Sequence, residues 1–288
     1  MEIIKTVSEK SYKEKTEALC ERLRVLTLED TVVAFSGGAD SSLLLKLAVL
    51  AARENGTKVF GITAGTKLHP LSDLESARKI AEEIGAEHLV VHMDELEKAG
   101  IMKNPEDRCY RCKKYLFEEL QKKAKELKAP VLLEGTNADD CKVYRPGLRA
   151  LQELGIISPL MEAGVTKEEV RQLSREYEIT TADRPAAPCL ATRFPYGTVL
   201  TWEKLRLVEQ AETFLKTFGF YNVRLRVHDS CARIEVDEKE FALVCKNSRA
   251  IVDFISGLGF DYVTLDLGGF RSGSMDLHVA NRKMVEKE

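Results

Sequence analysis

Short apolar runs alternate with longer helical patterns over the first part of the chain. Compact runs rich in Val, Ile, Leu and Phe predict buried strands, whereas apolar residues recurring every three or four positions predict helices. The expected strands cover residues 31–35, 58–63, 88–92 and 130–134, and the expected helices cover 42–53, 73–84, 113–127 and 166–177. The last helix opens with the capping-box sequence Thr166-Lys-Glu-Glu. This alternation indicates an α/β fold, with a parallel sheet flanked by helices and right-handed crossovers.

The pattern changes after residues 181–197, a proline-containing stretch without a clear period that we expect to be an ordered loop. The elements expected beyond it are a helix over 202–218, strands over 222–227 and 232–236, a helix from 239 to 245 or as far as 257, and a last strand over 262–267. This order predicts a smaller C-terminal α+β domain with an antiparallel sheet. We therefore divide the chain into a first domain (1–180), a connecting loop (181–198) and a second domain (199–288).

The composition narrows the class of protein. The chain of 288 residues has 43 Lys and Arg against 46 Asp and Glu, which argues against a general nucleic-acid binder. It has no apolar run of membrane-spanning length, and its N-terminus lacks the apolar core of a signal peptide. Seven cysteines are too sparse for a disulfide scaffold, so we expect reduced thiols, metal ligands or catalytic groups. A cytoplasmic protein without membrane or nucleic-acid partners is expected.

A glycine-containing loop, Ser36-Gly-Gly-Ala-Asp-Ser41, joins the first expected strand to the first expected helix. Glycines allow a tight turn and close approach of a ligand, and the unpaired amides of a helix start attract anions. The loop lacks the Gly-Lys-Ser/Thr of a Walker A sequence and the G-x-G-x-x-G of a dinucleotide site. It resembles the PP-loop of the ATP pyrophosphatase superfamily, which implies adenylation of a carbonyl or carboxylate with release of pyrophosphate.

A second glycine turn, Gly135-Thr-Asn137, ends the fourth expected strand. Ligands of open parallel sheets bind beyond the carboxyl ends of the strands, so this turn and the PP-loop are expected to face one nucleotide. The expected contacts for ATP and its Mg²⁺ are Ala34, Ser36, Gly37, Gly38, Asp40, Ser41, Ser42, Thr63, Gly135, Thr136, Asn137 and Asp140. Asp139 is a further candidate for Mg²⁺, but Asp139 and Asp140 are equally suited to capping a following helix.

Three cysteines stand in unusual positions. Cys109 and Cys112 form a C-x-x-C unit just before an expected helix, and Cys189 lies in the proline-containing loop. The pair is compatible with a redox dithiol, with half of a zinc site completed by Cys141 or a histidine, or with no special role. The alternative is that all three bind irons of a [4Fe–4S] cluster, which leaves one iron open for an extra sulfide.

Several longer strings resemble the LarE family over nearly the whole chain. They are Asn104-Pro-x-x-Arg108-Cys-Tyr-x-Cys112-Lys, Gly135-Thr-Asn-Ala-Asp-Asp140 with Tyr144-Arg-Pro-Gly147, Ala187-Pro-Cys189-Leu-Ala-x-Arg193 and Tyr262-Val-Thr-Leu-Asp-Leu-Gly-Gly-Phe-Arg-Ser-Gly-Ser-Met275. The resemblance implies an ATP-dependent sulfur transferase of nickel-pincer cofactor synthesis. Such an enzyme adenylates a carboxylate of pyridinium-3,5-dicarboxylate mononucleotide and converts it to a thiocarboxylate.

The resemblance also implies how sulfur is supplied. One kind of family member sacrifices a cysteine at the position of Cys189, and another kind uses three cysteines and a [4Fe–4S] cluster. Because this sequence has Cys109 and Cys112 as well as Cys189, it is similar to the second kind. The expected catalytic residues are Cys189, Cys109, Cys112 and Asp40. An external sulfide donor and a homo-oligomer are implied as well.

The second domain carries candidate contacts for the substrate phosphate. Arg224 and Arg226 are two positions apart on an expected strand, so both side chains project from one face, as in a phosphate clamp. The alternative is a solvated strand face with salt bridges. The expected substrate contacts are Arg193, Arg224, Arg226, Arg271, Ser272, Glu212 and Glu235, the two glutamates through the family resemblance.

Three other functions fit parts of the pattern. Some PP-loop enzymes that thiolate tRNA also pair a C-x-x-C with a third cysteine, but the acidic balance argues against RNA binding. An amidating ligase of the NAD- or GMP-synthetase type has no use for the three cysteines. A nucleotide-sensing module would bind ATP without forming pyrophosphate.

Overall fold

The computed structural model describes residues 11–142, 145–182 and 188–271. These residues form two compact units. The first unit takes residues 11–66, 71–93, 109–142 and 145–182, and the second takes 67–70, 94–108 and 188–271. Two stretches from the first half of the sequence therefore pack with the C-terminal unit. Within the described residues, no helix has the length and apolar character needed to cross a membrane.

The first unit is built on a four-stranded sheet in the order β3-β2-β1-β4. Its strands are β1 (Thr31–Ala34), β2 (Val59–Gly65), β3 (Glu87–His92) and β4 (Val131–Leu133). Every neighbouring pair runs parallel, with Val32 opposite both Phe60 and Leu132. The α/β class with a parallel sheet, predicted from the alternation of apolar runs and helical patterns, is confirmed.

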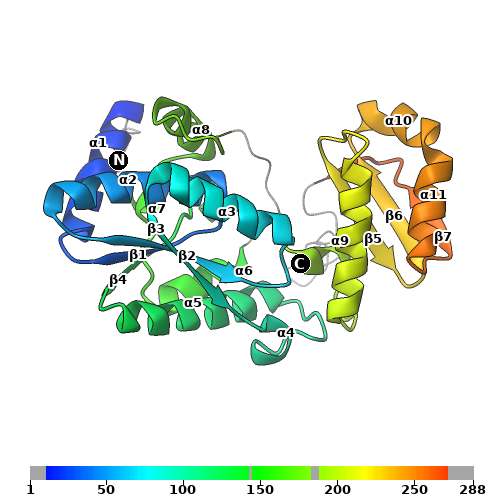
Figure 1. Cartoon of the computed structure of the whole chain (residues 1–288), viewed down its shortest axis with the longest axis horizontal. Coiled ribbons are helices and arrows are strands. Elements are labelled where there is room, and N and C mark those ends of the chain that lie inside the picture. Colours follow the sequence, from blue (N-terminus) through cyan, green and yellow to red (C-terminus); the bar gives the residue numbers. More distant parts are fainter. Residues whose placement is uncertain (1–10, 143–144, 183–187, 272–288) are drawn as a thin grey trace, which may run out of the picture. The chain divides into compact units, whose positions relative to one another are not determined.

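Helices cover both faces of this sheet (Figure 1). Successive side chains of a strand point to opposite faces, so Val33 and Val32 belong to different apolar clusters. Val33 packs in the cluster built from α1 (Tyr12–Leu26), α2 (Ala39–Asn55), α3 (Leu71–Ile84), α7 (Pro159–Glu162) and α8 (Lys167–Glu176). Val32 packs on the other face with α5 (Arg108–Glu126) and α6 (Pro146–Glu153). Both faces are thereby sealed, which leaves the carboxyl edge of the sheet for a ligand.

Several helices of the first part of the chain differ from the expectation. Helix α1 was not anticipated, although Ser11 and Glu14 form a capping box at its start. Helix α2 begins at Ala39 rather than at residue 42, because Gly38 is its N-cap and the Gly38 carbonyl accepts a hydrogen bond from Ser42 N–H at 2.9 Å. The PP-loop therefore runs directly into the first helical turn.

Helix α5 begins at Arg108 rather than at residue 113, so Cys109 and Cys112 lie inside its first turns. The reason is a local turn, in which Arg108 N–H donates to the Pro105 carbonyl at 2.9 Å, followed by a tertiary contact. The Tyr110 hydroxyl donates to Glu153 of α6 at 2.6 Å and holds the first turn against the neighbouring helix. The C-x-x-C unit is thus helical instead of preceding the helix.

The second unit has a three-stranded sheet in the order β5-β6-β7. Its elements are α9 (Trp202–Lys216), β5 (Val223–His228), β6 (Cys231–Val236), α10 (Phe241–Lys246), α11 (Ser248–Gly257) and β7 (Tyr262–Leu265). Strands β5 and β6 form an antiparallel hairpin, but β6 and β7 run parallel. The expectation of a purely antiparallel sheet is therefore wrong: the crossover through α10 and α11 returns the chain in the direction of β6. The α+β class is confirmed.

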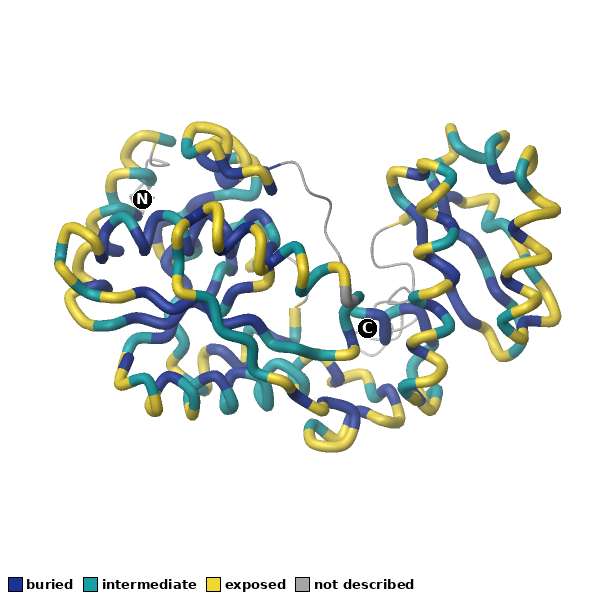
Figure 2. The backbone as a smooth tube through the Cα atoms, in the orientation of Figure 1, coloured by how far each residue is buried: buried dark blue, intermediate teal, exposed yellow. Residues whose placement is uncertain are grey.

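Alternation along β5 separates an apolar face from a charged one. Val223, Leu225 and Val227 are buried apolar residues, whereas Arg224 and Arg226 project from the opposite face and are buried too. Figure 2 shows β5 and β6 as buried segments, with exposed positions on the helices of this unit. Phe214 of α9 stacks on Phe254 of α11 with ring centroids 3.9 Å apart, which holds the two helices together. A small sheet thus buries charged residues on its second face.

Gly37 and Gly56 give a matched test of packing at the PP-loop. Both have left-handed φ angles, +70° and +73°, but a Cβ on Gly37 would lie 2.9 Å from Ala77 Cα, whereas a Cβ on Gly56 meets nothing within 4 Å. We expect Gly56→Ala to cost about 1 kcal/mol through φ strain alone. Gly37→Ala should cost roughly 2–4 kcal/mol, because overpacking adds to the strain. Urea unfolding followed by circular dichroism measures both, and equal losses would contradict the close packing of the loop on α3.

Candidate active site

The PP-loop is rigidified by its own serines. The Ser36 and Ser41 hydroxyls lie 3.0 Å apart, and Ser41 Oγ also accepts from Ser36 N–H at 3.2 Å. Gly37 has the left-handed backbone that the turn requires. Gly38 is the N-cap of α2, and as a glycine it has no side chain to cap the amides of the first turn. The start of α2 therefore presents backbone amides and the positive end of the helix dipole to an anion.

The turn after β4 meets the PP-loop at the carboxyl edge of the sheet. A Cβ on Gly135 would lie 3.0 Å from Ser41 N and 3.1 Å from the Asp40 carbonyl carbon, tighter than most Cβ contacts, so glycine favours this approach. The Asn137 side-chain amide donates to Asp40 Oδ1 at 3.1 Å. Two loops separated by almost a hundred positions thus form one surface.

Asp40 is also paired with a residue that the sequence analysis missed. Lys167 Nζ lies 2.5 Å from Asp40 Oδ2, and both side chains are partly exposed. Lys167 is the first residue of α8, directly after the capping Thr166. The capping box was recognisable in the sequence, but nothing in the sequence indicated that the adjacent lysine reaches the PP-loop.

The remaining carboxylates of this edge surround the short 3-10 helix η1 (Ala138–Lys142). Asn137 Oδ1 accepts from the N–H groups of Asp139 and Asp140, so the cap of this helix is Asn137 instead of either aspartate. Asp140 accepts from Asn137 N–H at 3.2 Å and pairs with Arg145 at 2.9 Å. Lys142 and the backbone N–H of Lys167 hold the pKa of Asp139 below its usual range.

These contacts suit a divalent cation. Asp40 and Asp140 supply only acceptor oxygens, the donor type that Mg²⁺ prefers. Each carboxylate is balanced by a protein cation in this structure, Asp40 by Lys167 and Asp140 by Arg145. A bound cation would take over part of that charge balance.

Three of the side chains expected to contact the nucleotide are instead buried or hydrogen-bonded within the protein. The Thr63 hydroxyl donates to the Phe35 carbonyl at 2.7 Å, and Ser42 is fully buried. The Thr136 hydroxyl donates to Glu134 at 2.8 Å. Ala34 ends β1 and offers a nucleotide only backbone and a methyl group. These residues shape the edge of the sheet rather than present polar side chains from it.

Glu134 is the centre of a buried network that the sequence analysis missed. Its carboxylate accepts from Thr136 N–H at 3.0 Å, from the Thr136 hydroxyl, and from the Ser158 hydroxyl in a short hydrogen bond. Lys113 Nζ lies 3.6 Å away, and Lys113 directly follows Cys112 on α5. The nucleotide-side turn and the cysteine-bearing helix are thereby linked through one carboxylate.

The C-x-x-C unit occupies the first turns of α5. Residues three apart on a helix share a face, so Cys109 and Cys112 lie on the same side of α5. Cys109 is exposed and Cys112 is partly buried. Arg149 stacks on the Tyr110 ring with 4.8 Å between the guanidinium and the ring centroid. None of the seven cysteines, all within the described residues, forms a disulfide.

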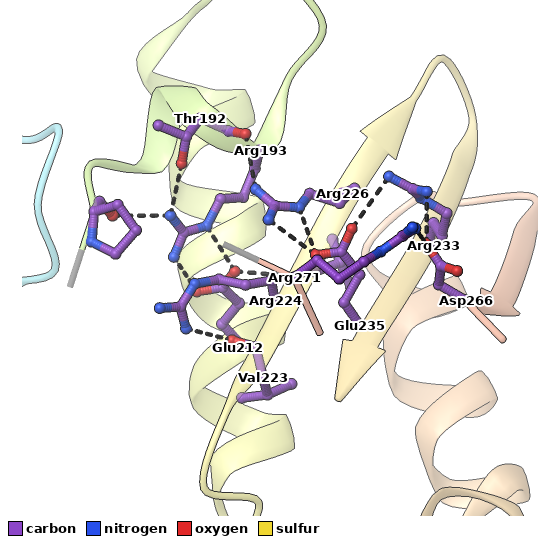
Figure 3. Close-up of polar contacts among 12 residues, drawn as sticks. Thr192, Arg193, Glu212, Val223, Arg224, Arg226, Arg233, Glu235, Asp266 and Arg271 are labelled. Atoms are coloured by element: carbon purple, nitrogen blue, oxygen red, sulfur yellow. Dashed lines mark hydrogen bonds and ion pairs between the residues drawn. The ribbon is translucent and has the colours of Figure 1, made fainter. Parts of the chain in front are cut away.

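In the second unit, Arg193 holds the backbone around Cys189. Cys189 immediately precedes the 3-10 helix η2 (Leu190–Arg193) and is partly buried. Arg193 Nη1 donates to the carbonyls of Pro188 at 2.8 Å and Cys189 at 3.2 Å. Its Nε and Nη2 donate to the two oxygens of Glu212 at 2.8 and 2.9 Å (Figure 3). The loop that carries Cys189 is therefore anchored to α9.

Glu212 stays ionised in this buried position. Burial by itself would raise the pKa of Glu212, but the hydrogen bonds and charge of Arg193 outweigh burial and hold the pKa below its ordinary value. Leu225 N–H of β5 also donates to the same carboxylate at 3.0 Å. Glu212 thus connects the cysteine loop, α9 and β5.

The predicted arginine clamp is buried rather than solvated. Arg226 donates to Glu235 at 3.0 Å and to the Thr192 carbonyl at 2.9 Å, and Glu235 is fully buried (Figure 3). Of the alternative, a solvated strand face with salt bridges, the solvation is wrong, because η2 contacts β5 and its Thr192 carbonyl accepts from the Arg226 guanidinium. The salt bridge is present, between Arg226 and Glu235. Arg224 donates to the Val223 carbonyl at 2.7 Å and lies over the Phe270 ring, and burial lowers its pKa.

Two substrate candidates lie at the end of the described chain. Arg271 Nη2 lies 3.8 Å from Asp266, which also pairs with Arg233 at 2.7 Å. Ser272 lies outside the described residues. The arginines and glutamates of the second unit thus form one connected set of contacts around the Cys189 loop.

The expected metal ligands fall in different units. Cys109 and Cys112 belong to the first unit and Cys189 to the second. Within the described residues, no three His, Cys, Asp or Glu side chains are gathered as a metal-binding group.

Known proteins resemble this chain over most of its length. The family model for NAD synthase matches residues 11–121, which include the PP-loop. A pyridinium-3,5-bisthiocarboxylic acid mononucleotide synthase of Lactiplantibacillus plantarum is 38% identical over 250 residues, covering 86% of this chain and 90% of the relative. An uncharacterized protein of Synechocystis sp. is 38% identical over 264 residues, covering 90% of this chain and 97% of the relative.

A more distant similarity covers less of the chain. The tRNA-specific 2-thiouridylase MnmA of Rickettsia felis is 28% identical over 193 residues, covering 54% of this chain and 51% of that protein. The similarity to the mononucleotide synthase extends over nearly the full length of both proteins and accompanies a PP-loop edge with the expected strand–loop–helix geometry. The chain therefore belongs to the LarE family.

Proposed function

We propose that this protein is an ATP-dependent sulfur transferase that converts a carboxylate of pyridinium-3,5-dicarboxylate mononucleotide into a thiocarboxylate. The product class is that in the printed name of the Lactiplantibacillus plantarum relative. The observation that carries the proposal is the convergence of Asp40, Asn137 and Lys167 at the start of α2. This arrangement suits a nucleotide triphosphate at the carboxyl edge of the sheet.

The proposed reaction begins with activation of the carboxylate. A carboxylate oxygen attacks the α-phosphorus of ATP, the bond from that phosphorus to the bridging oxygen breaks, and its electron pair leaves with pyrophosphate. The acyl adenylate then has AMP as a good leaving group. Sulfide attacks the acyl carbon, the acyl–oxygen bond breaks with its electron pair going to AMP, and a thiocarboxylate remains.

The chain's own groups would bind and orient ATP for this step. Amides of the first turn of α2 bind phosphate oxygens, and Gly37 keeps the loop close to α3. Asp40 and Asp140 would hold Mg²⁺, which neutralises developing charge on the phosphates when bound. Asn137 orients Asp40 through its amide.

The sulfur source is proposed from the cysteine pattern. Cys109 and Cys112, in the first turns of α5, would bind a [4Fe–4S] cluster together with Cys189. When bound, such a cluster supplies an open iron that carries the sulfide to be transferred. The alternative is that Cys189 gives up its own sulfur and becomes dehydroalanine.

The second unit is proposed to bind the substrate and to present Cys189. Arg193 and Glu212 hold the cysteine loop, and Arg224, Arg226 and Arg271 remain the proposed contacts of the substrate phosphate. We further propose residues 1–180 as the adenylation domain, 181–198 as the cysteine-bearing loop and 199–288 as the substrate and sulfur-transfer domain. An external sulfide donor, a homo-oligomer and a cytoplasmic location belong to the same proposal.

Thiolation of tRNA is the second candidate, because the distant match to MnmA includes the PP-loop region. Because the two candidate functions have different substrates, an assay of pyrophosphate release with each substrate distinguishes them. Release of pyrophosphate with the dicarboxylate mononucleotide, and none with tRNA, supports the sulfur transferase proposed here. The opposite pattern would overturn it.

Asp40→Asn should abolish adenylation without unfolding the first unit. Loss of one carboxylate weakens a magnesium site and removes the partner of Lys167. We expect pyrophosphate release to fall by roughly a hundredfold or more, since electrostatic stabilisation of the leaving group is lost. Asp30→Asn is the control: Asp30 accepts from Lys58 N–H just before β1, at the amino edge of the sheet opposite the PP-loop, so its loss should leave the rate unchanged.

Cys189→Ser should separate the two half-reactions. We expect normal pyrophosphate release and no thiocarboxylate, measured by mass spectrometry of the product under anaerobic conditions. About four irons per chain in the parent protein, lost in Cys109→Ser, support the cluster. An iron-free, active parent whose Cys189 becomes lighter by one H₂S supports the sacrificial alternative. Cys245→Ser, at an exposed position on α10, is the control.

Glu212→Gln should destabilise the second unit at neutral pH. Removing the charge leaves Arg193 buried and unpaired, which costs about 3–5 kcal/mol. Because the folded pKa of Glu212 is held below its ordinary value of 4.5, this stabilisation is present at pH 7. It is lost as the pH falls below that ordinary value and through the folded pKa, so parent and variant should converge in acid.

Urea unfolding followed by tryptophan fluorescence measures this, because the single tryptophan of the chain, Trp202, is the first residue of α9, the helix that also carries Glu212. Glu203→Gln on the exposed face of the same helix is the control, and should cost under about 1 kcal/mol. A Glu212→Gln loss no larger than the control would contradict the anchoring role of Glu212.

A further inference from the structure

We propose that Asn104 and Arg108 are positioning residues for the sulfur-transfer step, because together they hold the backbone that directly follows Cys189. That backbone is residues 190–200, here called the post-cysteine segment. The inference rests on the proposed function for its reaction, but its physical content, the hold on this segment, can be measured without any substrate. Both residues come from the stretch 94–108, which packs with the second unit although it belongs to the first half of the sequence.

Asn104 makes most of the contacts with the post-cysteine segment. It is fully buried, and its side-chain amide donates to the carbonyls of Phe194 at 3.1 Å and Pro195 at 2.7 Å. Its own carbonyl accepts from Gly197 N–H at 3.0 Å. Because two of these hydrogen bonds come from one planar amide group, they fix the direction of the segment as well as its distance from Asn104.

The backbone of Asn104 is suited to this position. Its φ angle is +46°, in the left-handed region that asparagine tolerates better than most residues other than glycine. Asn104 N–H donates to the Ile101 carbonyl at 2.8 Å, which closes a tight turn. Within that turn, the Met102 carbonyl accepts from Leu200 N–H at 2.7 Å. The turn therefore presents both backbone and side chain to the same segment.

Arg108 extends the hold to the residues nearest Cys189. Its Nη1 donates to the Ala191 carbonyl at 3.3 Å and also to Asn104 Oδ1. Its guanidinium lies over the Tyr196 ring, 5.4 Å from the ring centroid, and the residue is almost completely buried. Arginine suits this role because its planar group donates hydrogen bonds in its plane and stacks on an aromatic ring through its face.

Cys189 consequently has held backbone on both sides. Arg193 Nη1 donates to the Cys189 carbonyl at 3.2 Å, and Leu190 N–H donates to the Leu68 carbonyl at 2.7 Å. Asn104 and Arg108 then hold the chain from residue 191 onward. Fixed backbone on both sides limits the directions in which the Cys189 side chain can point, and group transfer requires such a restriction of the reacting group.

Arg108 also ties this hold to the C-x-x-C unit. It is the first residue of α5, and Cys109 follows it directly in the chain. Consecutive Cα atoms are about 3.8 Å apart, so a contact that fixes Arg108 also fixes the start of the cysteine-bearing helix. The Asn104–Arg108 pair thus restrains two of the expected sulfur-site cysteines, Cys189 through the segment that follows it and Cys109 through a peptide bond.

The test is hydrogen–deuterium exchange of the full chain, read by mass spectrometry, in the parent and in Arg108→Met without substrate. Methionine is an unbranched apolar side chain that donates no hydrogen bond. We expect amide exchange in residues 190–200 to rise about tenfold or more, because local opening becomes easier, while exchange in β5 and β6 stays within about twofold. Arg206→Met, at an exposed position on α9, is the matched control and should exchange like the parent.

A second variant keeps the test decisive if Arg108→Met does not fold. Asn104→Gly removes the side-chain hydrogen bonds to Phe194, Pro195 and Arg108 but favours the turn, because glycine adopts a φ of +46° without strain. It should give the same local rise in exchange. Parent-like exchange in residues 190–200 of either folded variant would overturn the inference. So would a rise spread evenly over residues 188–271 in both variants, because the pair would then serve the core of the whole unit.

Under the proposed function, the same two variants should separate the half-reactions. Pyrophosphate release with ATP and the dicarboxylate mononucleotide should stay within about twofold of the parent. Thiocarboxylate formation should fall roughly tenfold or more, because a small misplacement of a reacting group is enough for such a loss.

Failure of the inference is distinguishable from failure of the proposed function. If exchange rises locally in the variants but the parent forms no thiocarboxylate, the proposed function fails and the hold on the post-cysteine segment stands. If the parent forms thiocarboxylate and both variants form it at the parent rate, the proposed function stands and the positioning role fails.

Discussion

The contact between the Asn137 amide and Asp40 joins the two loops on which the first unit's chemistry depends. Gly135 favours it by letting the turn after β4 approach the backbone of α2, where a Cβ would come within 3.1 Å of the Asp40 carbonyl carbon. Once the loops meet, Lys167 and η1 have a fixed surface to pack on, since Asn137 also caps η1 and Asp139 accepts from Lys167 N–H. A single close approach thus organises amides, carboxylates and an ammonium at one edge of the sheet.

In the second unit the main constraint is the burial of charged side chains against a small sheet. Arg193 with Glu212 and Arg226 with Glu235 are almost completely shielded from solvent, so each charge needs its partner and additional hydrogen bonds. Those additional bonds go to the backbone around Cys189, through the carbonyls of Pro188, Cys189 and Thr192. The conformation of the cysteine loop is therefore coupled to buried ion pairs. Such pairs fix the position of the loop more than they raise the free energy of unfolding.

The sequence predicted the class of both units and several of the groups now seen at the sheet edge. The apolar runs located β1 to β4 closely, because a buried parallel strand leaves a continuous apolar signal. The start of α5 was misplaced because the polar turn Cys109–Cys112 has no apolar period, and its helix depends on the Tyr110–Glu153 contact. The parallel pairing of β7 was missed because strand direction is set by the crossover through α10 and α11.

By itself, the sequence determined the alternation of strands and helices, the PP-loop between β1 and α2, and the LarE-type cysteine positions. These are local patterns, which can be recognised from the order of the residues alone. Only the tertiary structure decided that Lys167 reaches Asp40, that Lys113 approaches Glu134, and that Arg226 turns to Glu235 and to the Thr192 carbonyl. Each of these contacts joins separate elements, so its existence depends on packing geometry that no local pattern encodes.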